Sequence, residues 1–443
     1  MKSEPVSTRS PQERVLVCGV LLGDQAPEFE GELAEIRGLV EAAGGAPLEV
    51  HLIQRRERPH PATLFGRGKV DEIREEVDAH KPDVVAVDND LSPAQGRNLE
   101  KALGCRVIDR SELILDIFAS RARTRQAKLQ VELAQNEYMA PRLRRMWTHL
   151  ERTEGAIGTR GPGETQLETD RRLLRKRITD LKRELSEIER RKKREVLSRS
   201  DRFTIGLVGY TNAGKSTLMN ALTGADVLAA DMLFATLDTR TRQWPLSDGR
   251  VVLLSDTVGF LGRLPHHLVA SFHATLEETL YADLLLHVVD ASHPDALEQI
   301  AAVDEVLGAL SHTTRAGMLV LNKVDRVRDP IELQYLVHDR KERVVHLSAQ
   351  TGEGLDRLDA LVRQALDARS ALLRIHLPLA DGRTAALVRR HGVVQEEEVV
   401  GDSELTLCVR MDEGALGNLL RESSGTLRYE VLEPARQVLL EER

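Results

Sequence analysis

The stretch GYTNAGKST at residues 209–217 constrains the fold of this 443-residue chain more than any other feature. It directly follows the apolar run FTIGLV, residues 203–208, and leads into TLMNAL, which has the composition of a helix. Gly209 and Gly214 allow the loop backbone to point successive amides at one anion, and the positive end of the following helix adds to the attraction. The sequence therefore predicts a strand, a phosphate-wrapping loop (a P-loop) and a helix in succession.

Three further short motifs each end an apolar run later in the chain. DTVG supplies Asp256, which can hold Mg²⁺ through a water molecule, and the amide of Gly259, which can sense a terminal phosphate. NKVD supplies Asp325, whose carboxylate can accept hydrogen bonds from N1 and N2 of guanine, a pair of donors that adenine lacks. SAQTG, residues 348–352, would bring backbone to the guanine edge. Together the four motifs predict a domain that binds and hydrolyses GTP.

Strand-like and helix-like patterns alternate in two separate regions, which predicts the α/β fold class. In the second region, five apolar runs separated by helical lengths predict the doubly wound sheet of a P-loop GTPase. An N-terminal α/β domain with a long helical hairpin is expected before it, and a small α+β domain after it. The expected boundaries are 1–115 for the N-terminal α/β domain, 116–202 for the helical hairpin with its glycine-rich tip and basic linker, 203–366 for the GTPase domain and 367–443 for the C-terminal α+β domain.

The expected strands of the N-terminal domain are 15–22, 48–53, 84–87 and 107–108, with helices at 28–43 and 69–80. The expected strands of the GTPase domain are 203–208, 251–255, 284–290, 318–322 and 344–347. In the C-terminal domain we expect strands at 372–377, 393–400, 404–410 and 427–432 and helices at 384–391 and 413–422. The order of the last set resembles a split βαβ sandwich.

Apolar residues in a seven-residue register predict the two long helices of the hairpin, one from about residue 122 and one from about residue 167. Between them lies GAIGTRGPGETQ, residues 155–166, whose four glycines and one proline predict a flexible tip. The run RRKKREVLSRSDR, residues 190–202, has few apolar residues and is expected to be a solvated linker.

The charge of the chain is distributed unevenly. Residues 116–202 carry 23 Lys and Arg against 14 Asp and Glu, although the whole chain has a formal net charge of −8. This region is the candidate contact for a polyanion, although long solvated helices have the same composition. Aromatic residues make up only 3% of the chain, which argues against recognition by stacking of unpaired bases.

Composition also limits where the chain acts. No apolar stretch approaches the roughly 20 residues of a membrane span, and the first residues lack the apolar core of a signal peptide. The three cysteines, Cys18, Cys105 and Cys408, are far apart and have no metal-ligand spacing. We therefore expect a cytoplasmic protein without a membrane span, monomeric when soluble, with peripheral membrane association left open.

Longer matches carry a family resemblance. The chain resembles the HflX family of ribosome-associated GTPases in four stretches, over essentially residues 12–366. The stretches are LFGRGKVDEI at 64–73, GTRGPGETQLETDRR at 158–172, LFATLDTRTR at 233–242 and DTVGFLGRLPHHLVASFHATLEE at 256–278. The resemblance implies a factor that binds the large ribosomal subunit and its rRNA, and that splits or rescues stalled or stress-inactivated ribosomes.

The resemblance also assigns roles around the nucleotide. FATLD would be the first switch, with Thr236 closing on Mg²⁺, and Thr241 is a competing candidate. Thr239 stands where the family commonly has proline. Phe260 replaces the glutamine that orients water in many GTPases, so we expect slow basal hydrolysis that a partner, a cation or a switch rearrangement accelerates. Asn212 occupies a position that relatives use for K⁺, although it can equally be a loop-stabilising side chain.

Taken together, the motifs and the resemblance assign the following residues. The catalytic candidates are Lys215, Thr236 and Gly259. The Mg²⁺ candidates are Ser216, Thr236 and, through water, Asp256. The GTP-binding candidates are Gly209, Tyr210, Thr211, Asn212, Ala213, Gly214, Lys215, Ser216, Thr217, Phe234, Ala235, Thr236, Leu237, Asp238, Asp256, Thr257, Val258, Gly259, Asn322, Lys323, Val324, Asp325, Ser348, Ala349 and Gln350. The candidate rRNA contacts are Arg152, Arg160, Gly161, Gly163, Arg171 and Arg172.

Two other functions remain open at this point. LFGRGK, residues 64–69, can be interpreted as a separate nucleotide site, because the resemblance extends to relatives that use ATP in this part, and the chain would then be an ATP-dependent rRNA remodeller. It lacks a full P-loop. A regulatory GTPase switch that binds a protein partner is the second alternative. A tRNA-modifying GTPase is disfavoured, because the terminal residues LLEER contain no cysteine.

Overall fold

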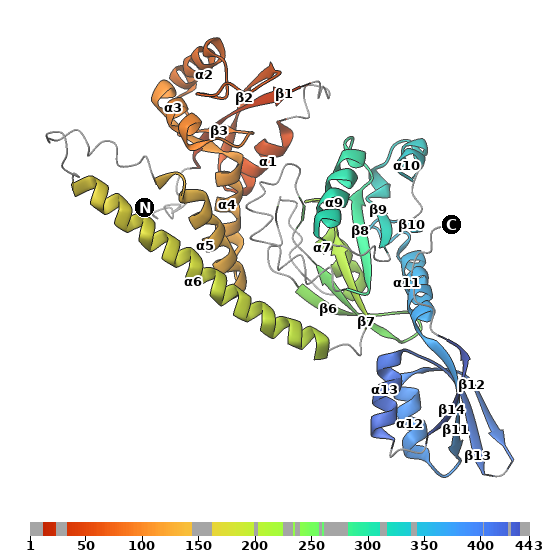
Figure 1. Cartoon of the computed structure of the whole chain (residues 1–443). Helices are drawn as coiled ribbons and strands as arrows, with labels where there is room; N and C mark the ends of the chain where they lie inside the picture. Colours follow the sequence, from red (N-terminus) through yellow and green to blue (C-terminus); the bar gives the residue numbers. More distant parts are fainter. Residues whose placement is uncertain are drawn as a thin grey trace, which may run out of the picture. The chain divides into compact units, whose positions relative to one another are not determined.

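The computed structural model (Figure 1) divides into two compact units. The first holds the described residues up to Ile188 together with Phe234, and the second holds the other described residues from Glu189 onward. The described residues are 12–23, 33–143, 162–198, 203–224, 234, 240–256, 259–260, 282–310, 317–337, 343–401, 403–423 and 427–434.

A four-stranded parallel sheet forms the centre of the first unit, in the order β2-β1-β3-β4. Its strands are β1 (Arg14–Leu22), β2 (Ala46–Arg56), β3 (Val84–Val87) and β4 (Arg106–Asp109). Each includes the run expected from the sequence. Both faces of β1 and β3 are buried, because helices cover the sheet on its two sides, as parallel sheets require.

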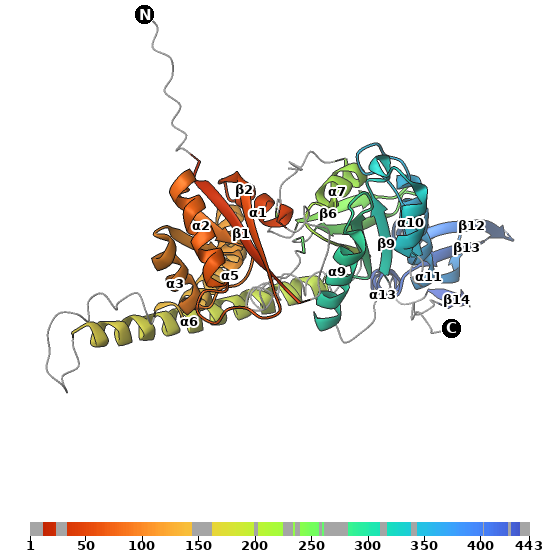
Figure 2. The ribbon, with the colours of Figure 1, turned by 90° about the horizontal axis from the view of Figure 1, so that it is seen from above.

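Helices from both sides complete this layer (Figure 2). α2 (Arg67–His80) and α3 (Pro93–Leu103) contribute Ile73, Val77, Leu99 and Leu103 to a core that also contains Leu16 and Phe65. α1 (Ala34–Ala42) packs on β1, and α4 (Arg110–Arg121) packs on β3 and β4. No bounds were predicted from the sequence for helices α3 and α4. They begin at capping residues Ser92 and Asp109, whose side chains accept from the amides of Gln95 and Glu112.

The helical hairpin is present, with different boundaries. The expected helix from residue 122 begins only at Arg125, because Thr124 caps α5 (Arg125–Met139) by accepting from the amide of Ala127. Its partner, α6 (Pro162–Ser198), is 37 residues long. The expected apolar seam is confirmed: Leu129 and Leu133 of α5 pack against Leu181 and Leu185 of α6.

Two expectations about α6 are wrong. Residues 162–166 were assigned to the flexible tip, yet they form the first turn and a half of the helix. Pro162 is compatible with this because the first helical residue needs no backbone N–H. The run from residue 190 was expected to be a linker, yet the helix continues to Ser198. Its Arg, Lys and Glu residues are strong helix formers, so a lack of apolar residues did not end the helix.

A six-stranded sheet forms the larger part of the second unit, in the order β10-β9-β8-β5-β7-β6. Its strands are β5 (Thr204–Val208), β6 (Arg240–Pro245), β7 (Val251–Asp256), β8 (Leu284–Asp290), β9 (Gly317–Asn322) and β10 (Arg343–His346). The five expected strands are parallel, whereas β6 is an unexpected antiparallel edge strand. Only Trp244 is fully buried in the run RTRQWP, so β6 lacks the apolar pattern of a central strand.

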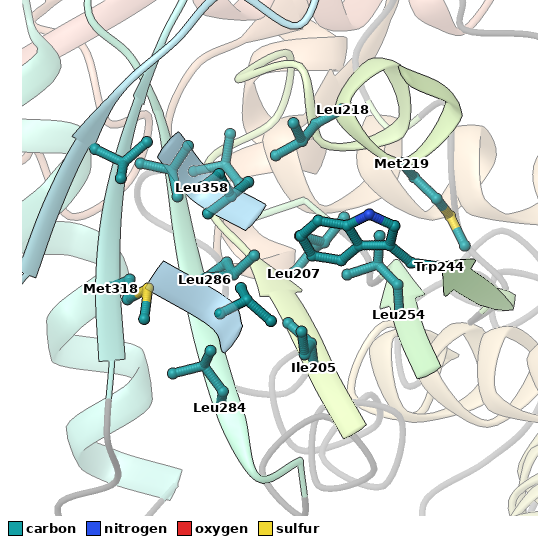
Figure 3. Packing of buried hydrophobic residues seen from close by; sticks show 14 of the residues in the cluster. Ile205, Leu207, Leu218, Met219, Trp244, Leu254, Leu284, Leu286, Met318 and Leu358 are labelled. Carbon is teal, nitrogen blue, oxygen red and sulfur yellow. The ribbon is translucent and has the colours of Figure 1, made fainter. Parts of the chain in front are cut away.

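The sheet carries helices on both sides. On one face, α7 (Lys215–Thr223) and α11 (Leu355–Arg369) pack onto a core that includes Leu207, Trp244 and Leu286 (Figure 3). On the other, α9 (Ala296–Leu310) and α10 (Pro330–Val337) contribute Ile300 and Leu336. Because the chain leaves β5 toward β7 and later returns to β8 on its other side, the carboxyl end of β5 is the point where ligands bind in doubly wound sheets.

The C-terminal part of the second unit is an antiparallel sheet in the order β12-β13-β11-β14, with two helices. Its elements are β11 (Ala371–Pro378), α12 (Gly382–His391), β12 (Val393–Val400), β13 (Glu404–Met411), α13 (Glu413–Glu422) and β14 (Arg428–Glu433). The six expected elements are all present. In the part of the chain that the structure describes, no helix is both long enough and apolar enough to span a membrane.

Candidate nucleotide site

The P-loop lies between β5 and α7, at the carboxyl edge of the sheet. Gly209 has a φ of 149° and Gly214 a φ of 92°, a region in which side chains are strained. Space also excludes a side chain: a Cβ on Gly209 would collide with the carbonyl of Val288, and one on Gly214 with the amide nitrogen of Asn322. The two glycines therefore permit the close approach of the loop to β8 and β9.

Lys215 begins α7 and lies under the loop. Its side chain is 6% exposed, and its Nζ donates to the carbonyls of Gly209 at 2.9 Å and Tyr210 at 2.7 Å. Burial lowers the pKa of Lys215 to about 8, and the negative charge of Asp256 opposes this shift. The ammonium is thus held at the inner side of the loop, within the region that would surround phosphates.

The Mg²⁺ candidates of the described chain meet at this point. The Ser216 hydroxyl donates to Oδ2 of Asp256 over 2.7 Å, although the two residues are 40 positions apart. Asp256 is 1% exposed and ends β7 beside the loop. A hydroxyl and a carboxylate oxygen next to a phosphate-binding loop fit Mg²⁺, which takes oxygen ligands and combines protein groups with phosphates and water.

The DTVG segment is joined to the P-loop by its backbone. The amide of Thr211 donates to the carbonyl of Phe260 at 2.7 Å, and the amide of Phe260 donates to the carbonyl of Gly209 at 3.0 Å. The Phe260 ring packs with Val208, Leu285 and other apolar residues and is 2% exposed. The ring therefore belongs to the core, as expected for a side chain that does not orient water.

Asn322 connects three of the motifs. Its side chain is 1% exposed. Its Nδ2 donates to the carbonyl of Ala213 in the P-loop at 2.8 Å, and its Oδ1 accepts from the amide of Ala349 at 2.9 Å. One buried amide thereby holds the P-loop and the SAQTG loop at fixed positions relative to β9.

The remaining guanine candidates lie in the NKVD and SAQTG motifs. Lys323 has a φ of 61°, and its Nζ lies 2.6 Å from Oδ2 of Asp290. Asp325 follows on an exposed 3-10 turn, so its carboxylate is available to a ligand. Ser348 is fully buried, and its hydroxyl accepts from the amide of Thr351 at 3.1 Å, which orders the SAQTG loop.

The segment predicted to be the first switch lies largely outside the described residues, including Ala235, Thr236, Leu237 and Asp238, as do Thr257 and Val258 of DTVG. Their assignments stay predictions. Phe234 is described: its ring is 2% exposed and meets Phe118 of α4 edge to face, with centroids 4.7 Å apart.

The competing switch candidate, Thr241, lies in β6. Its hydroxyl is 3.0 Å from that of Ser255, its partner on β7. Successive side chains of a strand point to opposite faces of the sheet. Thr241 therefore shares a face with Ser255 and not with Asp256, which favours Thr236 as the Mg²⁺ candidate.

The candidate rRNA contacts fall on both sides of the boundary of the described chain. Arg152, Arg160 and Gly161 lie outside the described residues, whereas Gly163 lies in the first turn of α6. Arg171 is half-buried and Arg172 is exposed, both on α6.

The LFGRGK stretch contacts its own domain. Leu64 and Phe65 are buried in the core, the Gly66 amide donates to Oε1 of Gln54 at 2.8 Å, and Lys69 pairs with Glu72 at 2.8 Å. These described contacts all lie within the N-terminal domain, and the stretch lacks a full P-loop. This geometry gives no support to a second nucleotide site.

Sequence reasoning missed two features of this site. The double contact of Asn322 with two other loops was not anticipated, because the sequence motif assigns Asn322 only to nucleotide binding. The buried hydroxyl of Thr211, in the middle of the P-loop, was assigned to GTP binding only by its position in the motif. No short-range pattern reveals either feature, since both depend on residues from other strands.

Comparison with protein families gives three matches along the chain. Residues 30–119 match the family described as "GTP-binding GTPase N-terminal", and residues 121–199 match "GTP-binding GTPase Middle Region". Residues 204–323 match "50S ribosome-binding GTPase". The third match contains the P-loop, the DTVG segment and the start of NKVD, whose described residues meet in the site above.

Curated relatives cover most of the chain. GTPase HflX of Escherichia coli is 47% identical over 86% of this chain and 89% of its own length, and that of Magnetococcus marinus is 46% identical over 87% and 89%. Among solved structures, a GTP-binding protein from the archaeon Sulfolobus solfataricus in complex with GDP is 24% identical, with a TM-score of 0.43 over 80% of this chain and 98% of that one. The relatives and the family models agree with the site geometry: the chain belongs to the HflX family and is a GTP-hydrolysing P-loop GTPase.

Proposed function

We propose that this GTPase binds the large ribosomal subunit in its GTP form and splits or rescues stalled or stress-inactivated ribosomes. GTP would favour the ribosome-bound conformation, and hydrolysis would release the factor, because a ligand shifts an equilibrium by its differential affinity for the two states. The protein would act on ribosomes in the cytoplasm as a monomer. The observation that carries the proposal is the match of residues 204–323 to the 50S ribosome-binding GTPase family over the assembled P-loop site.

Around the nucleotide, the residues of the site take the following roles. The P-loop amides and Lys215 would bind the phosphates, and Asp325 would select guanine. Ser216 would hold Mg²⁺ directly and Asp256 through water, and their 2.7 Å contact supports the pairing. When bound, Mg²⁺ neutralises charge on the β- and γ-phosphates.

The Phe260 ring is buried in the core and cannot orient the attacking water. Fast hydrolysis would therefore depend on a partner, a cation or a rearrangement of the switch. Asn212 is exposed on the P-loop with a φ of 61°, which leaves its side chain available for a K⁺ ion. Replacing Na⁺ with K⁺ in a turnover assay is expected to raise the rate of the wild type but not of Asn212→Ala. Equal rates in the two salts would contradict the role of K⁺.

Contact with rRNA would involve the basic surface of α6. Arg172, Arg175 and Lys176 are exposed within little more than one turn of α6, and none has an acidic partner among the described residues. Other α6 cations are paired with α5, such as Arg177 with Glu132 at 2.6 Å. The unpaired group supports a role in binding phosphates, because paired cations are already neutralised.

Sedimentation tests the proposal. Purified protein is mixed with large subunits or whole ribosomes in GDP or a non-hydrolysable GTP analogue, then centrifuged through sucrose. We expect co-migration with large subunits in the analogue, little in GDP, and conversion of whole ribosomes to subunits.

Lys215→Ala is the control that removes nucleotide binding. Absence of co-migration in every nucleotide state would refute the ribosomal role, and co-migration without conversion would refute splitting alone.

A further inference from the structure

The side chain of Thr211 has an unusual environment in the P-loop. The residue is 6% exposed, and its Oγ1 is fully enclosed without a hydrogen-bond partner in the described part of the chain. Its backbone is fixed, since its amide donates to the carbonyl of Phe260 at 2.7 Å. A buried hydroxyl without a partner is unfavourable, and buried polar groups are nearly always paired. A ligand that supplies the partner would remove this cost.

The neighbours of Thr211 indicate the kind of ligand atom that would reach it. A Cβ placed on Gly259 would lie 2.8 Å from Thr211 Cα, 2.9 Å from its Cγ2 and 3.0 Å from Lys215 Nζ. The Cα and methyl group of Thr211, the backbone of Gly259 and the ammonium of Lys215 thus lie close together, and the Thr211 hydroxyl is carried by the same Cβ as that methyl group. Gly259 is the residue whose amide is expected to sense a terminal phosphate, and an ammonium attracts anionic oxygen. A hydroxyl can donate one hydrogen bond, and a phosphate oxygen accepts it.

We propose that the Thr211 hydroxyl donates a hydrogen bond to the γ-phosphate of GTP and so distinguishes the triphosphate from GDP. This inference rests on the proposed placement of GTP in the P-loop. Binding would require the groups that enclose the hydroxyl to move, and Lys215 has a flexible side chain whose Nζ would exchange the carbonyls of Gly209 and Tyr210 for phosphate oxygens. GDP has no γ-phosphate oxygen, so it leaves the hydroxyl without its partner.

Thr211→Val removes the hydroxyl and retains the shape of the side chain, and Thr211→Ser is the matched control that retains the hydroxyl. We expect Thr211→Val to bind GDP within about twofold of the wild type, and to bind a non-hydrolysable GTP analogue roughly tenfold or more weakly, the effect of one hydrogen bond to a charged group. Thr211→Ser should keep the ratio of the wild type. Fluorescence titration with labelled nucleotides in Mg²⁺ measures both affinities.

Thermal unfolding without nucleotide separates this role from a structural one. Because the hydroxyl has no partner in the described chain, Thr211→Val should melt at or above the temperature of the wild type. The inference would be overturned if Thr211→Val kept the wild-type ratio of GDP affinity to analogue affinity, whether both affinities fall equally or neither changes.

If Thr211→Val does not fold, Thr211→Ala replaces it in the test, and its ratio of GDP affinity to analogue affinity is compared with that of the wild type. A different result would contradict the placement of GTP in the P-loop itself. In that case Lys215→Ala would bind guanine nucleotides as tightly as the wild type does.

Discussion

At the scale of single residues, the site depends on a few buried polar groups with partners from distant parts of the chain. Asn322 donates to Ala213 and accepts from Ala349, residues that are 109 and 27 positions away. A buried amide with both ends satisfied fixes two loops, because losing either bond leaves a buried group unpaired. The short distance between Ser216 and Asp256 couples α7 to β7 in the same way.

We propose that one residue, Asp325, also decides the choice of base. We predict that Asp325→Asn binds GDP at least about 100-fold more weakly, because hydrogen bonds to a charged acceptor are the strong ones. Xanthine carries an oxygen in place of the guanine amino group, so an amide donor at this position should improve the affinity for XDP. Titration with labelled GDP and XDP measures both effects.

Asp329→Asn provides the matched control for this change. Asp329 is an exposed acid four residues further on, and its Oδ1 accepts from the amide of Ile331, a contact that asparagine can also make. An unchanged affinity of Asp325→Asn for GDP would remove Asp325 from the guanine site.

At the scale of elements, the hairpin shows how a sparse apolar pattern can hold a long helix. Most of the described side chains of α6 are exposed or half-buried, and Leu181 and Leu185 are its fully buried residues in that part. Ion pairs such as Lys182 with Glu137 at 2.8 Å flank the seam. Exposed pairs of this kind contribute at most about 1 kcal/mol each, so the leucines are the main source of stability.

We therefore predict that Leu181→Ala lowers the free energy of unfolding of the hairpin by about 2–5 kcal/mol, through lost burial and the cavity left behind. Hydrogen exchange of α5 and α6 amides measures this locally, without assuming that the whole chain unfolds in one step. Leu173→Ala is the control on the same helix, since Leu173 is 56% exposed. Equal protection in the two variants would show that the seam does not stabilise the hairpin.

Elements with strong local patterns were predicted correctly from the sequence, and the others were not. β8 and α13 have their expected bounds, since an apolar run and a periodic helix are local signals. β6 escaped detection because its pairing with β7, and not its own composition, makes it a strand. The end of α6 was predicted too early because the polar run from residue 190 was expected to be a linker. Its Arg, Lys and Glu residues also favour helices, and the helix continues to Ser198.

At the scale of the whole molecule, binding to a ribosomal particle would be governed by phosphate contacts. We predict that the double variant Arg172→Ala, Arg175→Ala binds large subunits more weakly than the wild type. The slope of the logarithm of the binding constant against the logarithm of salt concentration should become less steep by roughly 1–2, because each phosphate contact releases a counterion. Co-sedimentation over a series of KCl concentrations measures the slope.

Arg383→Ala with Arg390→Ala removes two exposed charges from α12 and is the matched control for net charge. An identical slope in the two double variants would exclude α6 from the contact. Neither pair should alter GDP affinity, since no member of either lies in the nucleotide site.

The sequence by itself determined the presence of the P-loop, its position between a strand and a helix, the guanine motif and the alternation of strands and helices that gives parallel sheets, because these depend on neighbouring residues and their periodicity. Only the tertiary structure decided which of these residues meet: Asn322 with Ala213 and Ala349, Phe234 with Phe118, and the hydroxyl of Thr211 enclosed without a described partner. Such contacts join segments far apart in the chain, and the free energy of burying polar groups and rings is set by the surroundings that folding creates.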